Sequence, residues 1–272
     1  MADLGPYGEL VDTRLRVLTW NIWWRFGPWE RRQPAIRETL RRVDADVIAL
    51  QEVWATDDGE QAGLLAEDLG FHFVYAARDD WDGVKFGNAV SSRWPIVFSE
   101  WQPLPAGETE EHRLVLRADI EGPRGVVQVF CTHLNWRFDD SDVRQAQVRE
   151  VCRFIADARP RDYPPVLCGD LNADPASDEI RMLTGRASVP VPKLVFKDAW
   201  EVAGEGPGMT WSNDNPFARL ALEPDRRIDH VMVGWPKVGG RGHVVNAELA
   251  ATDLVDGVQP SDHYGVVVEL RY

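Results

Sequence analysis

The sequence has few cysteines and no long apolar run. Its three cysteines, Cys131, Cys152 and Cys168, form an odd count without the spacing of a disulfide framework. Cys131 and Cys168 each lie at the end of an apolar run, which favours buried, reduced thiols. No apolar stretch approaches the length of a membrane-spanning helix. The opening MADLGPYGELVDTRL lacks the basic-then-apolar order of a secretion signal, so we expect a cytoplasmic protein.

Basic residues are outnumbered by acidic ones. Lysine and arginine total 30 against 44 aspartates and glutamates, which gives a formal net charge of -14. Long-range repulsion therefore disfavours an indiscriminate nucleic-acid binder, although local arginines and a bound cation can reverse the field inside one cleft. No repeat, low-complexity segment or linker is evident. With 44% hydrophobic residues the chain can bury a large core, and we predict a single domain over residues 1–272.

Short apolar runs outnumber the helical patterns. Helices are predicted over residues 33–43, 61–69 and 142–158 from their charges and apolar spacing. Strands are predicted over residues 14–20, 46–50, 71–75, 88–92, 113–120, 126–131, 166–168, 227–233 and 266–271. Too many of these strands are adjacent in sequence for a simple alternating α/β fold. The sequence therefore predicts an α+β fold with two sheets and helices outside them.

Polar side chains suited to metal or proton chemistry recur next to these apolar runs. Asn21 follows VLTW, Glu52 follows VIALQ, and His133 follows VVQVFCT. The same pattern recurs later in the chain at Asp170, Asn172, Asp229, Asp262 and His263. One such residue can be an ordinary turn former. Strand ends are rigid and open onto solvent, so the repeated pattern predicts side chains held around a cleft.

This set of residues suits the hydrolysis of a phosphate ester. A divalent cation that neutralises phosphate oxygens needs hard oxygen ligands, such as those of Asn21, Glu52 and Asp262. The attacking water must lose a proton, which suits Asp170 beside the amide of Asn172. The cation could be Mg²⁺, and an oxygen-rich site also accepts Mn²⁺ or Ca²⁺.

Histidines can supply the hydrogen-bond donors that such a reaction needs. His263 and His133, with Asn172, are candidates to meet the charge that develops on phosphorus. Asp229 is the natural carboxylate partner for His263, because a histidine beside a carboxylate can stay protonated near neutral pH.

The order of these segments resembles the endonuclease/exonuclease/phosphatase superfamily, which includes the DNase I-like nucleases. The resemblance is carried by LTWNIW, IALQEV, GNAVSSRWPI, CTHLNW, GDLNADP, RRIDHVMV and SDHYGV. It runs from about Arg14 to the C-terminus. It implies a four-layer α/β/β/α sandwich of two mixed β-sheets flanked by helices, with the active cleft at one end of the sheets.

The resemblance also implies a role for each candidate metal or water ligand. Glu52 matches the principal Mg²⁺ ligand, Asn21 the amide beside it, and Asp262 a carboxylate near the metal. Asp170 matches the carboxylate that orients or deprotonates the attacking water, and Asn172 matches its amide partner.

The remaining matches concern the phosphate. His263 matches the histidine that contacts it, and Asp229 the carboxylate that orients this histidine. His133 matches a second catalytic histidine of some branches, and Asn88 is expected along the cleft near the phosphate. Ser91 departs from the family pattern, where a bulky apolar residue is commoner.

The substrate is left open by the sequence. The leading hypothesis is a metal-dependent phosphoesterase acting on a phosphodiester or phosphomonoester in a small or lipid-like molecule. The alternatives are a nuclease acting on DNA or RNA and an inactive binding module. Tryptophans near the expected cleft could pack or stack on substrate, namely Trp23, Trp24, Trp29 and Trp136. Arginines that could contact phosphate, or lie on the surface, are Arg137, Arg144 and Arg219.

Overall fold

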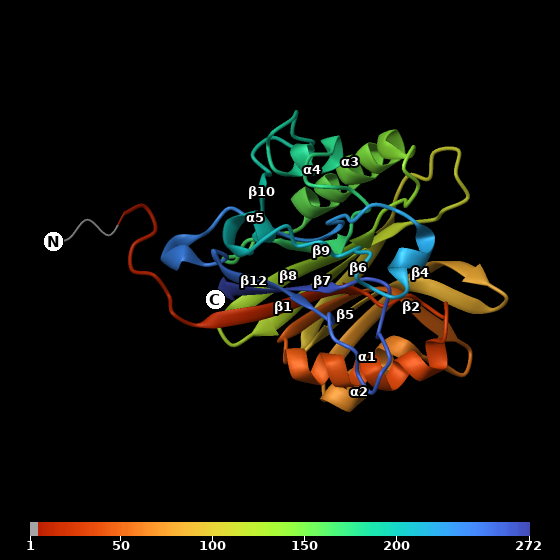
Figure 1. Cartoon of the computed structure of the whole chain (residues 1–272). Coiled ribbons are helices and arrows are strands. Elements are labelled where there is room, and N and C mark those ends of the chain that lie inside the picture. The colour runs from red at the N-terminus through yellow and green to blue at the C-terminus, as the bar shows by residue number, and fades with distance from the viewer. Residues whose placement is uncertain (1–4) are drawn as a thin grey trace.

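A computed structural model describes residues 5–272 (Figure 1). Residues 1–4, the start of the predicted domain, lie outside this described part. The α-helices are α1 Trp29–Val43, α2 Gln61–Leu69, α3 Ser141–Asp157, α4 Asp178–Leu183 and α5 Ala199–Ala203. Short 3-10 helices lie at Ala218–Ala221 and Val238–Gly240. None of the described helices has the length and apolar character needed to cross a membrane.

The first sheet has seven strands, in the order β12-β13-β1-β2-β5-β4, with β3 paired to β2. Its strands are β1 Arg14–Asn21, β2 Val47–Thr56, β3 Gly59–Glu60, β4 His72–Trp81, β5 Val84–Ser92, β12 Val244–Ala250 and β13 Gly265–Arg271. β1 and β2 are parallel, whereas the other pairs are antiparallel, so the sheet is mixed.

The second sheet has six strands, in the order β10-β11-β9-β8-β7-β6. Its strands are β6 Ile96–Pro103, β7 Leu114–Gly122, β8 Gly125–His133, β9 Val166–Asp170, β10 Phe196–Asp198 and β11 Asp229–Gly234. It too is mixed, because β8 and β9 are parallel and the other pairs are antiparallel.

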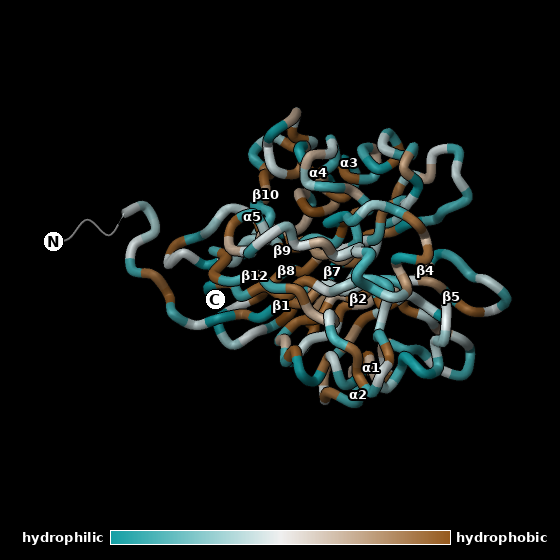
Figure 2. The backbone as a smooth tube through the Cα atoms, viewed as in Figure 1, coloured by the Kyte–Doolittle hydropathy of each residue, from teal (hydrophilic) through white to brown (hydrophobic). Residues whose placement is uncertain are grey.

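Apolar clusters separate four layers. Side chains alternate along β1. Val17 therefore packs in the cluster between the two sheets, and Leu18 packs in the cluster between the first sheet and helices α1 and α2. On the opposite side, Phe130 of β8 packs with Phe154 of α3. α1 and α2 lie below the sheets in Figure 1 and α3 and α4 above them, while apolar colour fills the middle of Figure 2. The predicted four-layer sandwich of two mixed sheets is confirmed.

The predicted elements differ from the structure mainly at sheet edges. Strands β3, β6, β10 and β12 were not predicted. β6, β10 and β12 are each the outermost strand of their sheet, and β3 is a two-residue strand paired to β2. β6 is largely exposed, so it lacks the apolar alternation that reveals a half-buried strand. The first helix begins at Trp29 rather than at residue 33, since Arg32 already donates its backbone N–H to Pro28. α5 was also missed.

Candidate active site

The two sheets bring the predicted polar residues to one end of the molecule. Asn21 is the last residue of β1 and pairs in parallel with Gln51 of β2. In the other sheet, His133 and Asp170 end the parallel strands β8 and β9 and lie opposite each other. Asp229 begins β11, which runs antiparallel to β9 and places it beside Asp170. Strand direction and register therefore gather residues that are far apart in sequence.

Close backbone packing positions Asp170. A side chain at Gly169 would place its Cβ 2.1 Å from the carbonyl oxygen of Thr132, so the approach of β8 and β9 requires glycine there. After Asp170 the chain turns sharply, and Asn172 adopts a left-handed φ of 48°. The Asn172 N–H donates to Asp170 Oδ1 at 2.9 Å, and Arg226 Nη2 donates to the Asn172 carbonyl at 2.9 Å. These contacts hold the turn that follows the strand.

Glu52 reaches the site from within a strand. It was predicted to follow a strand ending at residue 50, but β2 continues to Thr56 and Glu52 lies at a bulge. The pairing register with β5 shifts between Leu50 and Val53, and Glu52 has a left-handed φ of 56°. A bulge locally redirects a side chain, and backbone strain of this kind is concentrated at functional sites. The correction therefore strengthens the functional interpretation of Glu52.

The buried side chain of Arg32 joins two loops at the site. Its Nη1 donates to the carbonyls of Ile22, at 2.8 Å, and Pro260, at 2.9 Å, and its Nη2 donates to Trp23 at 2.6 Å. The loop after Asn21 is thereby tied to the segment before Asp262. The sequence analysis missed this residue, because an arginine in a charged helix is typical of a solvent-facing position.

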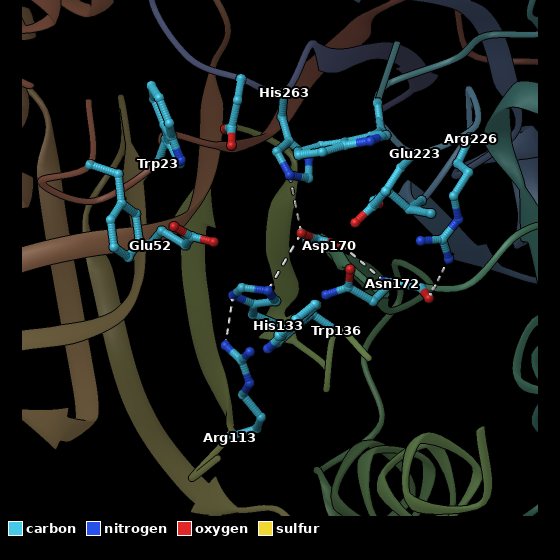
Figure 3. A pocket seen from close by; sticks show the side chains of 14 residues that line it. Trp23, Glu52, Arg113, His133, Trp136, Asp170, Asn172, Glu223, Arg226 and His263 are labelled. Atoms are coloured by element: carbon cyan, nitrogen blue, oxygen red, sulfur yellow. Dashed lines mark hydrogen bonds and ion pairs between the residues drawn. The ribbon is translucent and has the colours of Figure 1, made fainter. Parts of the chain in front are cut away.

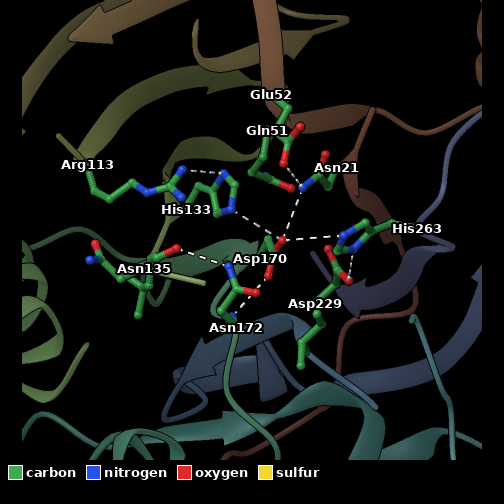
Figure 4. A network of polar contacts seen from close by, with 12 residues as sticks. Asn21, Gln51, Glu52, Arg113, His133, Asn135, Asp170, Asn172, Asp229 and His263 are labelled. Atoms are coloured by element: carbon green, nitrogen blue, oxygen red, sulfur yellow. Dashed lines mark hydrogen bonds and ion pairs between the residues drawn. The ribbon is translucent and has the colours of Figure 1, made fainter. Parts of the chain in front are cut away.

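Asp170 is the centre of a polar network (Figure 4). Its Oδ2 accepts a hydrogen bond from Asn21 Nδ2 at 3.1 Å. The Nε2 atoms of His133 and His263 lie 3.4 Å and 3.7 Å from the same oxygen. Because Asp170 is 1% exposed, these groups meet out of bulk water. The arrangement can hold a water beside a carboxylate that has donors on two sides.

His263 is held in the protonated form by its carboxylate neighbours. Its Nδ1 lies 2.9 Å from Asp229 Oδ2, which is the pairing the sequence predicted. Burial acts to lower the pKa of His263, but the charges of Asp229 and Asp170 outweigh burial and raise the pKa well above its ordinary value. The Trp211 ring packs edge-on against the imidazole with centroids 5.0 Å apart.

The partly buried Glu52 and the buried Asp262 form a pair of acids with little compensation. Burial, followed by repulsion from Asp262, raises the pKa of Glu52 to about 7. The pKa of Asp262 is raised to about 6, mainly by burial. Glu52 Oε2 is buried without a hydrogen-bond partner, and the charges of His263 and Arg113 only partly offset the rise in the pKa of Glu52. Hard oxygens of this kind suit a divalent cation, which would supply the missing positive charge.

Asn21 lies between these acids and Asp170. Its Nδ2 donates to Glu52 Oε1 at 2.9 Å as well as to Asp170, while its Oδ1 accepts from the Trp23 N–H at 2.9 Å. In this arrangement the amide orients two carboxylates. Its predicted role as a metal ligand stays a prediction, as do the individual roles of the other site residues.

A second group of potential metal ligands lies on the other side of Asp170. One ligand atom each from Asp170, Asp229 and His263 lies within 4.8 Å of the others. His263 Nδ1 is already bonded to Asp229, however, and a protonated imidazole has no lone pair for a metal. Glu52 and Asp262 are therefore the better cation ligands, and the Asp229–His263 pair is better suited to contacting phosphate.

The site opens into a cavity of about 170 Å³ (Figure 3). Among the predicted residues, its lining includes Glu52, His133, Asp170, Asn172, Asp262 and His263. A neighbouring hollow of about 380 Å³ shares Glu52 and Trp136 with this cavity. Trp136 is 51% exposed at the rim, so its ring is available to a ligand.

Some expectations about the surroundings need correction or addition. Asn88 is buried, and its Nδ2 donates to the Leu114 carbonyl at 3.4 Å. It does not line either cavity, so its predicted contact with phosphate stays a prediction.

Arg144 does not face the site. It pairs with Glu179 at 2.9 Å and donates to the Arg137 carbonyl, which braces the loop after β8.

Six cavity-lining residues were not predicted at the site, namely Phe26, Arg113, Trp211, Glu223, Arg226 and Ile228. Arg226 and Ile228 belong to the RRIDHVMV segment, whereas no local motif distinguishes Arg113, Trp211 or Glu223, which lie in connecting segments and reach the site only through the fold. The three cysteines are buried and free, as predicted.

Comparisons with known proteins identify the family of the chain. The sequence profile of the "Endonuclease/Exonuclease/phosphatase family" matches residues 18–263. The protein YbhP of Escherichia coli, described as uncharacterized, is 30% identical over 172 residues, which cover 58% of this chain and 66% of YbhP. The inositol phosphosphingolipids phospholipase C of Schizosaccharomyces pombe is 27% identical over 204 residues, covering 68% of this chain and 46% of that protein.

The chain thus spans less than two thirds of each of these relatives. A crystal structure of an endonuclease/exonuclease/phosphatase from Beutenbergia cavernae superposes with a TM-score of 0.72 at 28% identity. That superposition covers 95% of this chain and 71% of the other.

Proposed function

Since the chain belongs to the endonuclease/exonuclease/phosphatase family, whose members are hydrolases of phosphate esters, we propose that it is a divalent-metal-dependent phosphoesterase acting on a small or lipid-like substrate. The observation that carries this proposal is one buried carboxylate, Asp170, between two imidazoles and beside an uncompensated pair of acids. An inactive binding module is disfavoured, because Glu52, Asp170, Asp262 and both histidines are present together in one cavity.

Glu52 and Asp262 are the residues that would hold the cation. The buried and unpartnered Glu52 Oε2, together with the raised pKa values of both acids, supports this assignment. A bound divalent cation supplies charge neutralisation for the phosphate oxygens and the leaving oxygen. Mg²⁺ is the first candidate, and Mn²⁺ or Ca²⁺ would be accepted by the same oxygen donors.

The chain's own residues supply the proton transfer and the orientation. A water beside Asp170 Oδ2 loses its proton to this carboxylate as its oxygen attacks phosphorus in line with the leaving oxygen. Asn172 and Asn21 hold Asp170 through its two oxygens. His263, kept protonated by Asp229, donates to a phosphate oxygen and stabilises the charge that develops there.

The charge around the cavity supports a small ester rather than a long polyanion. Two arginines line the cavity, but both are engaged internally: Arg113 with Glu111 at 2.6 Å, and Arg226 with Asp174 at 3.1 Å. The exposed ring of Trp136 offers a surface for an apolar portion of the substrate. The name of the fission-yeast relative, which includes a phosphosphingolipid, points in the same direction.

The direct test is the release of p-nitrophenol from bis-p-nitrophenyl phosphate and p-nitrophenyl phosphate, with Mg²⁺ and with EDTA. We expect activity with Mg²⁺, loss in EDTA, and loss in Asp170→Ala and His263→Ala. Asp178→Ala and His72→Ala are matched controls, because both side chains are exposed on the surface. Activity that survives EDTA and both site substitutions would end this proposal.

A nuclease is the alternative, and salt dependence separates the two. Binding of a nucleic-acid backbone weakens steeply with salt because counterions are released. If the protein is a nuclease, its rate of DNA nicking should therefore decrease steeply as the salt concentration rises. The rate of hydrolysis of a small ester should change little with salt. A panel of nucleotides, sugar phosphates, phospholipid head groups and oligonucleotides under one metal condition would then identify the substrate class.

A further inference from the structure

Arg113 makes an unusual contact with one of the two site histidines. It precedes β7, is almost fully buried, and places Nη1 3.0 Å from His133 Nδ1 (Figures 3 and 4). A guanidinium has N–H donors and no acceptor, so His133 Nδ1 must be the acceptor in this bond. The ring proton of His133 is then on Nε2, the atom that lies 3.4 Å from Asp170 Oδ2.

Other residues leave Arg113 little freedom to turn away. Its Nε and Nη2 both donate to Glu111 Oε2, at 3.1 Å and 2.6 Å. The centroid of the Phe86 ring lies 5.6 Å from the guanidinium carbon and 5.9 Å from the centroid of the His133 ring. The guanidinium is therefore held between a carboxylate and an imidazole, with Nη1 aimed at the imidazole.

His263 has the opposite kind of partner at the equivalent ring atom. Its Nδ1 lies 2.9 Å from Asp229 Oδ2, and a carboxylate can only accept, so this Nδ1 carries a proton. Two imidazoles thus approach the same oxygen of Asp170 through Nε2. Nδ1 of His133 faces a hydrogen-bond donor, whereas Nδ1 of His263 faces an acceptor. Their chemical roles should differ accordingly.

We propose that Arg113 is a positioning residue that keeps Nδ1 of His133 unprotonated, so that His133 donates a hydrogen bond through Nε2 and does not carry the proton moved in hydrolysis. The catalytic consequence rests on the proposed phosphoesterase function, whereas the tautomer is a property of the protein alone. A second imidazole free to accept a proton would compete with Asp170 for the proton of the water. Arg113 removes this competition by occupying the only other basic atom of the ring.

Nitrogen NMR of the histidine rings tests the tautomer without substrate or metal. We expect the His133 resonances, assigned by their loss in His133→Asn, to show a protonated Nε2 and an unprotonated Nδ1 across about pH 6 to 8. His263 should show a protonated Nδ1 in the same spectrum. In Arg113→Met, His133 should shift to a mixture of tautomers or gain a second proton, whereas Arg113→Lys should preserve the wild-type pattern because an ammonium also only donates.

Two results would overturn the proposal. One is a proton on Nδ1 of His133 in the wild-type protein, which decides the matter even if Arg113→Met does not fold. The other is a folded Arg113→Met whose His133 spectrum is unchanged. Arg78→Met is the control, because the Arg78 side chain is exposed and, among residues 5–272, donates only to the backbone carbonyl of Arg113.

A double-mutant cycle tests the catalytic consequence. Arg113→Met should lower kcat/KM by about 10- to 100-fold, as for other residues that orient a functional histidine. In a His133→Ala background the same substitution should cost less than about twofold, because a residue acting through His133 has nothing left to position. An equal loss in both backgrounds would mean that Arg113 contacts the substrate directly, and would contradict the proposal. A wild-type protein without phosphoesterase activity would refute the proposed function, with the spectrum still deciding the tautomer.

Discussion

Glu52 and Asp119 are both carboxylates on sheet strands, Glu52 partly buried and Asp119 fully buried, and their surroundings are opposite. Asp119 of β7 is fully buried and accepts from Arg117 at 2.7 Å and from Arg161 at 2.8 Å. Burial acts to raise its pKa, but hydrogen bonds from the two arginines outweigh burial and hold the pKa below its ordinary value. The side-chain carboxylate of Glu52 has Asn21 as its one hydrogen-bond partner within residues 5–272, and its pKa is raised to about 7 by burial and by Asp262.

The difference shows how a structural acid and a functional acid are distinguished in this protein. Where a buried carboxylate supports the fold, the chain provides the opposite charge itself. At Glu52 the charges of His263 and Arg113 do not outweigh burial, which is costly for a buried charge but leaves room for a cation from outside. Substitutions of the two acids should therefore affect different properties, and the expected effects below run from the largest to the smallest.

The largest effect should be the loss of catalysis in Glu52→Gln. We expect kcat/KM for bis-p-nitrophenyl phosphate in Mg²⁺ to fall by about 100- to 1,000-fold, the range for removing one group that organises transition-state charge. Asp119→Asn, assayed at a temperature where it is folded, should retain most of the activity. If Glu52→Gln and Asp119→Asn lost similar amounts of kcat/KM, the two acids would not differ in their role in catalysis.

The next effect is on stability, and it should be confined to the structural acid. Removing one partner from a buried ion pair leaves the other uncompensated, so Asp119→Asn should lower the free energy of unfolding by about 3 kcal/mol. Urea unfolding monitored by circular dichroism measures this. Glu121→Gln, an exposed neighbour on the same strand, is the control and should change stability by less than about 0.5 kcal/mol. An Asp119→Asn protein as stable as this control would contradict the expectation.

Cation binding should separate the two acids without any substrate. A cation that binds the folded protein alone stabilises it by about 2.7 kcal/mol at 100 times Kd. Raising Mg²⁺ should therefore raise the melting temperature of the wild type and of Asp119→Asn, and EDTA should reverse the shift. Glu52→Gln should respond weakly. A full Mg²⁺ response in Glu52→Gln would mean that the cation binds elsewhere.

The pH dependence of stability should have opposite signs for the two acids. In EDTA, the raised pKa of Glu52 means that the folded protein holds its proton more tightly than the unfolded chain, so stability falls as pH rises from 4.5 to about 7. Glu52→Gln should then be more stable than wild type by roughly 3 kcal/mol at about pH 8, with the difference vanishing near pH 4.5.

Asp119 should show the reverse dependence. Its lowered pKa contributes stability above pH 3.8, and this contribution is lost as pH falls from 3.8 toward the lowered value. The difference in the free energy of unfolding between wild type and Asp119→Asn should therefore become smaller as the pH falls below 3.8. Urea unfolding at several pH values measures the free energy of unfolding of each variant relative to wild type. If this free energy depended on pH in the same way for Glu52→Gln and wild type, the pKa of Glu52 would not be raised by folding.

Much of the site could be predicted because its residues follow apolar runs in a recognisable order. Asp170 and Asn172 after PVLCG, and Asp262 with His263 before the last strand, were identified in this way and lie together in the cavity. The Asp229–His263 pair was also predicted, and it forms at 2.9 Å. The edge strands β6 and β12 were missed, because a partly exposed strand needs no apolar alternation.

The sequence by itself determined the family, the four-layer fold and the set of chemical groups, because strand periodicity and local motifs are recorded in neighbouring residues. The tertiary structure alone decided the partners of those groups. Arg32 binds the Pro260 carbonyl across 228 positions, and Arg113 reaches His133 through the pairing of β7 with β8. Hydrogen bonding and charge compensation depend on distances of a few ångströms, which are set by register, bulges and burial. The protonation states at this site are therefore properties of the folded chain.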